Sequence, residues 1–146
     1  EEDGIDGIEA HLKEHRPDIL IIDMLDKVSL PSSVASGTIP QHEKLREVYR
    51  RTRDLATRYS CATFGYSQLS ADAEGRVNLN LSMMENSRTG KASEADLMIL
   101  IGKYAMIEGA SENDPRRVFN IAKNKISGWH GQINVMLDGR VARYDD

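Results

Sequence analysis

The spacing of apolar residues predicts two amphipathic helices. Between residues 3 and 15, apolar side chains recur every three or four positions on one helical face, and Asp3 and Pro17 suit the two ends. Residues 41–59 carry a longer apolar stripe of the same kind. Arginines occupy much of the rest of the second helix, and we interpret them as a solvated basic face, with a subunit contact as the alternative.

Short aliphatic runs predict the strands of an α/β domain. Residues 19–25, Ile-Leu-Ile-Ile-Asp-Met-Leu, are too few for a helix and are typical of a strand buried on both faces of a parallel sheet. Three further strands and a closing Asp-Gly hairpin are expected at 60–67, 97–102, 117–123 and 132–144. The predicted fold is therefore α/β, with a mostly parallel sheet flanked by helices and a C-terminal antiparallel hairpin.

Composition narrows the classes of protein. A chain of 146 residues suits one domain, and its net charge of −4 provides no global basic field for nucleic acid. The single cysteine, Cys61, excludes an internal disulfide and favours a reducing compartment; we expect it to be a small core residue of a cytoplasmic protein (in the host cytoplasm if viral). No apolar run approaches membrane-spanning length, and His11, His15 and His42 have no metal-ligand spacing.

Polar residues follow several of the predicted strands, where the ligands of parallel sheets bind. Asp23 follows the first strand, and a carboxylate there can hold Mg²⁺ through water; capping the next turn is the alternative. Gln68 follows the second strand and can hydrogen-bond a phosphate or an attacking water. The step from Ser93 to Asp96 precedes the third strand, and Lys123 and Lys125 close the fourth and suit an anion.

Taken together, these segments resemble the C-terminal, RecA-type ATPase domain of DnaB-like replicative hexameric helicases. The matching segments follow the family's order over residues 18–146: Ile19–Leu25 as the Walker B strand, Tyr66–Leu69, Glu94–Ile99, Ala122–Lys125, and Asp138-Gly139 with Arg143-Tyr144. The resemblance implies that residues 1–146 are the part of a RecA-like helicase ATPase domain from Walker B onward.

The resemblance also implies a role for individual residues. Asp23 would organise Mg²⁺ on ATP, and Gln68 would link the γ-phosphate to a DNA-binding loop. Lys125, with Lys123, would reach the ATP held by the adjacent subunit of a hexameric ring. Two long polar loops, around Ser29 to Thr38 and Ser70 to Arg88, would line the central channel and contact single-stranded DNA. The remaining implied contacts are Ser70, Arg76 and Arg88 for DNA, and Arg143 and Tyr144 for the nucleotide; Tyr144 closing the hairpin is the alternative.

Several departures from the family pattern bear on activity. Position 125 is Lys where the family usually has Arg, which removes bidentate phosphate contact but keeps the charge. The segment around Arg88 and Lys91 is not a phosphate loop, because Glu85 stands at the first glycine position and Ala92 at the hydroxyl position. We therefore expect this chain alone not to hydrolyse ATP.

We expect the chain to be part of an ATP-dependent replicative helicase that unwinds DNA in the 5′–3′ direction and translocates on single-stranded DNA. A primase or helicase loader is a further expected partner, and no membrane is involved. Two alternatives stay open. One is a RecA-type recombinase, and the other is a degenerate ATPase-like module that assists assembly or loading without catalysis.

Overall fold

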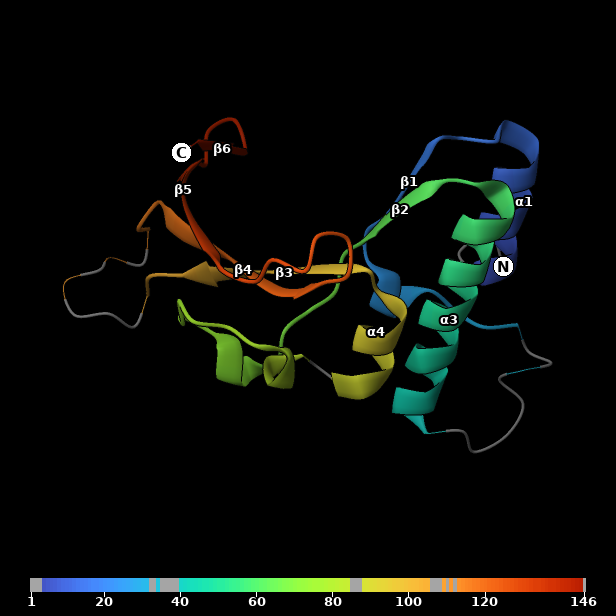
Figure 1. Ribbon diagram of the computed structural model, residues 1–146, viewed down its shortest axis with the longest axis horizontal. Coiled ribbons are helices and arrows are strands. Elements are labelled where there is room, and N and C mark those ends of the chain that lie inside the picture. The colour runs from blue at the N-terminus through green and yellow to red at the C-terminus, as the bar shows by residue number, and fades with distance from the viewer. Residues whose placement is uncertain are drawn as a thin grey trace. The chain divides into compact units, whose positions relative to one another are not determined.

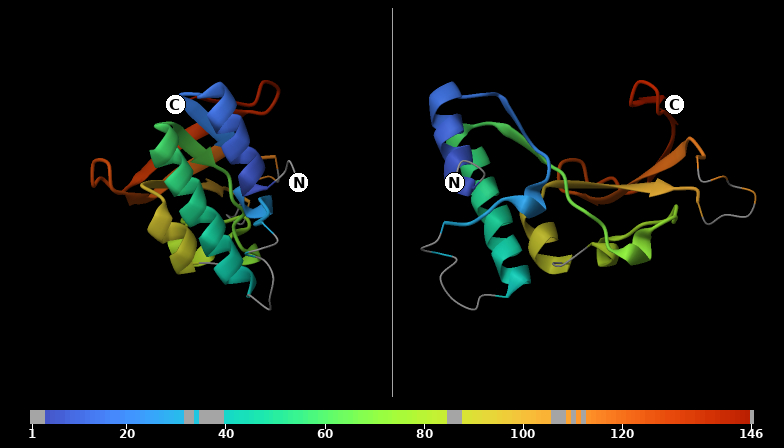
Figure 2. Two further views of the ribbon diagram at one scale, coloured as in Figure 1. Left: turned by 90° about the vertical axis from the view of Figure 1, so that its right-hand side faces the viewer. Right: turned by 180° about the vertical axis from the view of Figure 1, so that it is seen from behind.

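The computed structural model describes residues 4–31, 34, 40–84, 88–105, 109, 111 and 113–145, without the side chains of residues 88 and 89. The chain divides into two compact units. Figures 1 and 2 show the elements of the chain, coloured by residue number. Unit 1 comprises Glu1–Gln68 with Thr89–Ala95, and unit 2 comprises Leu69–Arg88 with Asp96–Asp146.

Unit 1 packs helices on one face of a short parallel sheet. Its sheet consists of β1 and β2, which pair in register from Ile19 with Ala62 to Ile22 with Gly65. The element bounds are α1 (Ile5–His15), β1 (Ile19–Ile22), η1 (Leu25–Lys27), α3 (Gln41–Tyr59), β2 (Ala62–Gly65) and α4 (Arg88–Glu94). The short helix α4 begins where the predicted second polar loop ends, and no helix was predicted there.

The two long helices confirm the predicted amphipathic segments. Helix α3 has the predicted bounds, and α1 ends before Arg16, whose φ of 45° is left-handed. The helix cap predicted at Asp3 lies outside the described residues; Gly4 is the N-cap residue and makes no side-chain cap. Cys61 is buried in the core beside Leu12, as predicted. Of the described helices, none has both the length and the apolar character needed to cross a membrane.

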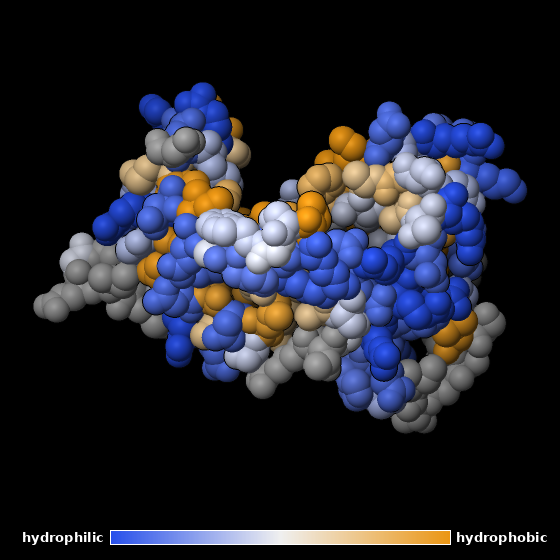
Figure 3. Space-filling model, in the orientation of Figure 1, coloured by the Kyte–Doolittle hydropathy of each residue, from blue (hydrophilic) through white to orange (hydrophobic). Residues whose placement is uncertain are grey.

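Described residues cover only one face of the β1–β2 sheet of unit 1. Leu20 and Ile22 pack against the cores formed with α1 and α3. The alternate residues face away and are largely exposed: Ile19, Ile21, Phe64 and Tyr66. Figure 3 shows apolar side chains that reach the surface. The prediction of burial on both faces is therefore wrong for these strands, because a continuous aliphatic run does not reveal whether a second layer covers it.

Unit 2 contains a four-stranded sheet in the order β3-β4-β5-β6, and every neighbouring pair is antiparallel. The bounds are β3 (Leu97–Lys103), β4 (Arg116–Asn124), β5 (Gln132–Asp138) and β6 (Arg143–Asp145). The β5–β6 hairpin confirms the predicted C-terminal hairpin. The prediction of a mostly parallel sheet is wrong for β3 and β4: in β3, buried Leu100 and Gly102 alternate with exposed residues, as in a sheet covered on one side.

A folded segment, residues 69–84, covers one face of the unit 2 sheet. It contains η2 (Ala71–Ala73) and η3 (Leu81–Met83), and buries Leu79 against Leu100. Asn120 of β4 anchors it: its Nδ2 donates to Val77 O at 2.9 Å, and its Oδ1 accepts from Leu79 N at 3.3 Å. A Cβ on Gly102 would collide with the Val77 carbonyl, so glycine permits this close approach.

Candidate functional site

Asp23 and Gln68 lie at the same edge of the β1–β2 sheet. The two strands are parallel and in register, so their carboxyl ends coincide. Beyond these ends the chains remain bonded, since Tyr66 N donates to Ile22 O at 3.0 Å and Leu25 N donates to Tyr66 O at 2.9 Å. Both Asp23 and Gln68 are exposed. Unit 1 therefore has a carboxylate and an amide beyond the carboxyl ends of two neighbouring strands, the edge where ligands of parallel sheets bind.

A single exposed carboxylate at this edge could hold a hydrated Mg²⁺. Within the described part of the chain, no three His, Cys, Asp or Glu side chains gather as ligands. Mg²⁺ does not need such a cage, because it keeps several waters and is usually held by one or two carboxylates together with substrate phosphates. Asp23, exposed at the end of a rigid strand, can supply one such carboxylate.

Two residues that the sequence reasoning did not assign form a buried ion pair next to this edge. Lys91 of α4 is fully buried, and its Nζ lies 2.8 Å from Asp26 Oδ2 and 2.9 Å from Ser67 Oγ. Asp26 also accepts hydrogen bonds from Tyr49 Oη at 3.0 Å and from the Gln68 backbone N–H at 3.3 Å. Burial, the largest cause, raises the pKa of Tyr49, so its hydroxyl remains a donor. No periodic or spacing signal marks Asp26 or Lys91 in the sequence.

Lys123 and Lys125 lie in unit 2, at and just beyond the end of β4. Lys123 pairs with Met98 in the β3–β4 ladder. Lys125 N donates to Asp96 O at 2.8 Å, and its exposed Nζ lies 3.9 Å from Asp96 Oδ1. The antiparallel pairing thus brings the two lysines to the start of β3, next to Asp96.

Arg143 and Tyr144, predicted as nucleotide contacts, lie in β6. The Arg143 guanidinium bonds to Asp145 Oδ2 at 3.0 and 3.1 Å. The Tyr144 ring meets the Phe119 ring edge-on, with 5.0 Å between centroids, and 40% of Tyr144 is exposed. Tyr144 therefore packs on the sheet of unit 2, and its contact with a nucleotide stays a prediction.

Two of the three DNA-binding candidates, Ser70 and Arg76, belong to the segment 69–84 that covers the unit 2 sheet. Arg76 is exposed, and its carbonyl accepts from Lys103 N at 3.0 Å. Ser70 Oγ donates to Met83 O at 3.0 Å, so this hydroxyl holds the segment closed on itself. The side chain of Arg88 lies outside the described residues, as do residues 32, 33 and 35–38 of the predicted first loop.

The loop after β4 is ordered by Asn124. Its Oδ1 accepts from the Ile126 and Ser127 backbone N–H groups at 3.0 Å, and its Nδ2 donates to Trp129 O at 3.1 Å. His130 Nδ1 lies 3.3 Å from Ile121 O. Residues 125–127 form a turn, and Trp129, two residues after it, is half exposed.

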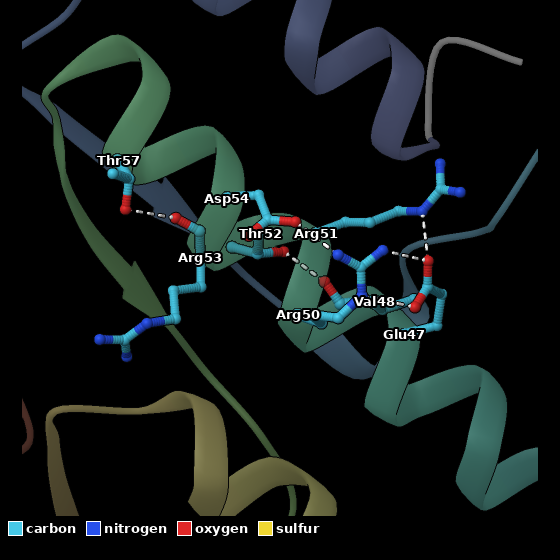
Figure 4. Close-up of polar contacts among 8 residues, drawn as sticks. All are labelled: Glu47, Val48, Arg50, Arg51, Thr52, Arg53, Asp54 and Thr57. Carbon is cyan, nitrogen blue, oxygen red and sulfur yellow. Dashed lines mark hydrogen bonds and ion pairs between the residues drawn. The ribbon is translucent and has the colours of Figure 1, made fainter.

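Three arginines on the basic face of α3 pair with acidic side chains of unit 1. Figure 4 shows Glu47 between Arg50 and Arg51, with Asp54 on the other side of Arg50. Farther along, Arg58 pairs with Glu9 of α1. These arginines therefore belong to a network of surface ion pairs within unit 1.

This network makes the stability of α3 depend on pH. Hydrogen bonds from Arg50, and then from Arg51, lower the Glu47 pKa from 4.5 to about 2. Because the folded-state pKa is depressed, the stabilisation is complete above pH 4.5 and is lost as the pH falls toward 2. Glu47→Gln should cost about 0.5–1 kcal/mol of unfolding free energy at pH 7, and less than half as much at pH 3. Urea titration by circular dichroism measures both values, with the exposed Glu43→Gln as control; an equal penalty at both pH values would contradict the assignment.

The comparisons with known proteins support a likeness of fold. No protein-family model and no curated protein sequence matches the chain. Among solved structures, it is similar to the ATPase domain of G40P, with a TM-score of 0.81 and 19% identity over 99% of this chain and 51% of that one. It is also similar to a DnaB-like replicative helicase, whose structure was described with its interactions with primase; here the TM-score is 0.79 and the identity 18%, over 97% of this chain and 34% of that one.

This chain thus spans about half and about a third of the two solved chains that it resembles. The predicted resemblance to the ATPase domain of DnaB-like replicative helicases is confirmed at the level of the fold.

Proposed function

We propose that this chain provides the Mg²⁺-organising and phosphate-sensing part of an ATP-driven DNA helicase with a RecA-like ATPase domain. The observation that supports the proposal is the parallel, in-register pairing of β1 and β2, strands that Asp23 and Gln68 follow in the chain. The likeness of fold to replicative helicase ATPase domains supports the same reading.

Each candidate residue has a distinct task in this proposal. Asp23 would hold Mg²⁺, which would supply positive charge to the phosphates of ATP. Gln68 hydrogen-bonds the γ-phosphate or the attacking water. Lys125, assisted by Lys123, stabilises the transferring phosphoryl group of the ATP held by a neighbouring subunit. Arg143 and Tyr144 contact the nucleotide.

The DNA and protein partners follow from the same proposal. Ser70, Arg76 and Arg88 contact single-stranded DNA in the channel of a hexameric ring, where a local positive surface suffices for an acidic chain. A primase or a helicase loader is a further partner, in keeping with the primase interactions of the helicase to which the chain is similar in fold.

Unwinding of a forked DNA substrate by the protein that carries this chain tests the proposal. Asp23→Asn should reduce ATP-dependent unwinding by about two orders of magnitude, because the metal loses its carboxylate ligand. Asp18→Asn is the matched control, since Asp18 is an exposed carboxylate immediately before the same strand. Strand pairing without unwinding would favour a recombinase. If Asp23→Asn leaves an ATP-independent role in assembly or loading intact, the result would favour the non-catalytic assembly module.

A further inference from the structure

The buried Lys91 ammonium joins three separate segments of unit 1. It reaches from α4 to Asp26 in η1, after β1, and to Ser67, after β2, at 2.8 and 2.9 Å. Its side chain has no solvent exposure, and that of Asp26 is 14% exposed. A buried charge is tolerated only where its partners are well placed, so this geometry permits little freedom to the groups around it.

Asp26 carries this constraint to the backbone of Gln68. Its Oδ2 atom accepts from Lys91 Nζ, from Ser67 Oγ at 2.8 Å, and from the Gln68 N–H at 3.3 Å. Ser67 Oγ in turn accepts from Lys91, which closes a triangle of hydrogen bonds. Tyr49 holds the other oxygen of Asp26. The backbone at Gln68 is thus tied to a carboxylate whose position Lys91 sets, while the Gln68 side chain stays exposed.

We infer that Lys91 is a positioning residue, which acts through Asp26 and Ser67 to hold Gln68 at the carboxyl end of β2. This inference rests on the proposed function, in which Gln68 contacts the γ-phosphate. A side chain that reads a phosphate needs a fixed backbone, because small displacements weaken a hydrogen bond strongly.

Amide hydrogen exchange of this chain, followed by NMR without nucleotide, tests the positioning directly. Lys91→Met leaves Asp26 charged and unpaired, so the main variant is Lys91→Met with Asp26→Asn, which removes both charges at similar volume. In this double variant, exchange at the Gln68 amide should rise about tenfold, as one hydrogen bond is weakened. The amides of Leu25 and Cys61, which bond to backbone carbonyls, should change less than about threefold.

Three outcomes would overturn the inference: no rise at Gln68 in the folded double variant, an equal rise across unit 1, or failure of the double variant to fold. The last two assign the ion pair a general structural role.

A second measurement separates this inference from the proposed function. In the protein that carries the chain, the double variant should lower the kcat of ATP hydrolysis about tenfold and leave KM within about threefold, as expected when a transition-state contact is lost. Altered exchange with unchanged kcat would support the positioning by the Lys91–Asp26 pair and overturn the role proposed for Gln68. Unaltered exchange would overturn the positioning itself, whatever Gln68 does.

Discussion

Asp26→Ala is expected to lower the unfolding free energy of unit 1 by about 3–5 kcal/mol, because it leaves the Lys91 ammonium buried without its counter-charge. Lys91 has no solvent exposure, so it cannot regain hydration without local opening of the unit. The variant also removes the acceptor of the Tyr49 and Ser67 hydroxyls. Unpaired buried donors add to the penalty.

Urea unfolding of the chain can assign this loss to unit 1. The described α-helices lie almost entirely in unit 1, so ellipticity at 222 nm reports that unit. Trp129, the one tryptophan of the sequence, reports unit 2 through its fluorescence. Asp54→Ala is the matched control, because Asp54 forms an exposed ion pair with Arg50, worth at most about 1 kcal/mol. An Asp26→Ala penalty no larger than that of the control would contradict a buried, paired Lys91.

Lys125→Ala is expected to reduce DNA-stimulated ATP hydrolysis by about three orders of magnitude in the protein that carries this chain, while nucleotide binding stays nearly intact. In the proposed role, Lys125 is a cation supplied from a neighbouring subunit, which would stabilise charge that develops only in the transition state. The Lys125 side chain is half exposed, with Asp96 3.9 Å away, so its removal should cost little folding stability.

Two controls sharpen this experiment. Lys125→Arg keeps the charge and adds bidentate geometry, so it should retain activity, whereas Lys13→Ala removes an exposed lysine of α1 and should have no effect. Mixing Lys125→Ala subunits with Asp23→Asn subunits tests action between subunits. Some interfaces of the mixture then combine an intact Asp23 with an intact Lys125, and part of the activity should return. Unchanged turnover of Lys125→Ala, or no recovery on mixing, would refute the role assigned to Lys125.

The local elements of this protein follow from its sequence. Helix α3 is present at the predicted residues because its apolar stripe has the helical period and Ser60, just beyond it, accepts a left-handed conformation. The C-terminal hairpin forms where alternating strands flank Asp138-Gly139. The placement of Asp23 and Gln68 after neighbouring strands also follows from the sequence, since both strands are short aliphatic or small-residue runs that end in polar residues.

Strand direction and layer coverage were decided by the tertiary structure. The run Leu97–Gly102 is apolar throughout, yet β3 pairs antiparallel with β4 and exposes alternate residues. An apolar run has the same composition whether it is buried on one face or on two. The direction of strand pairing depends on which other segment of the chain packs next to it. The same holds for β1, where Ile19 and Ile21 are exposed.

The ion pair at the candidate site also needed the tertiary structure. Asp26 and Lys91 are 65 residues apart and lie in segments without hydrophobic periodicity. A lysine in a polar segment is ordinarily exposed, and only packing against η1, α3 and the end of β2 buries this one. The sequence by itself determined which residues stand at the strand ends. Packing of distant segments determined which of them are held in place, because buried charges are positioned by partners that sequence spacing does not identify.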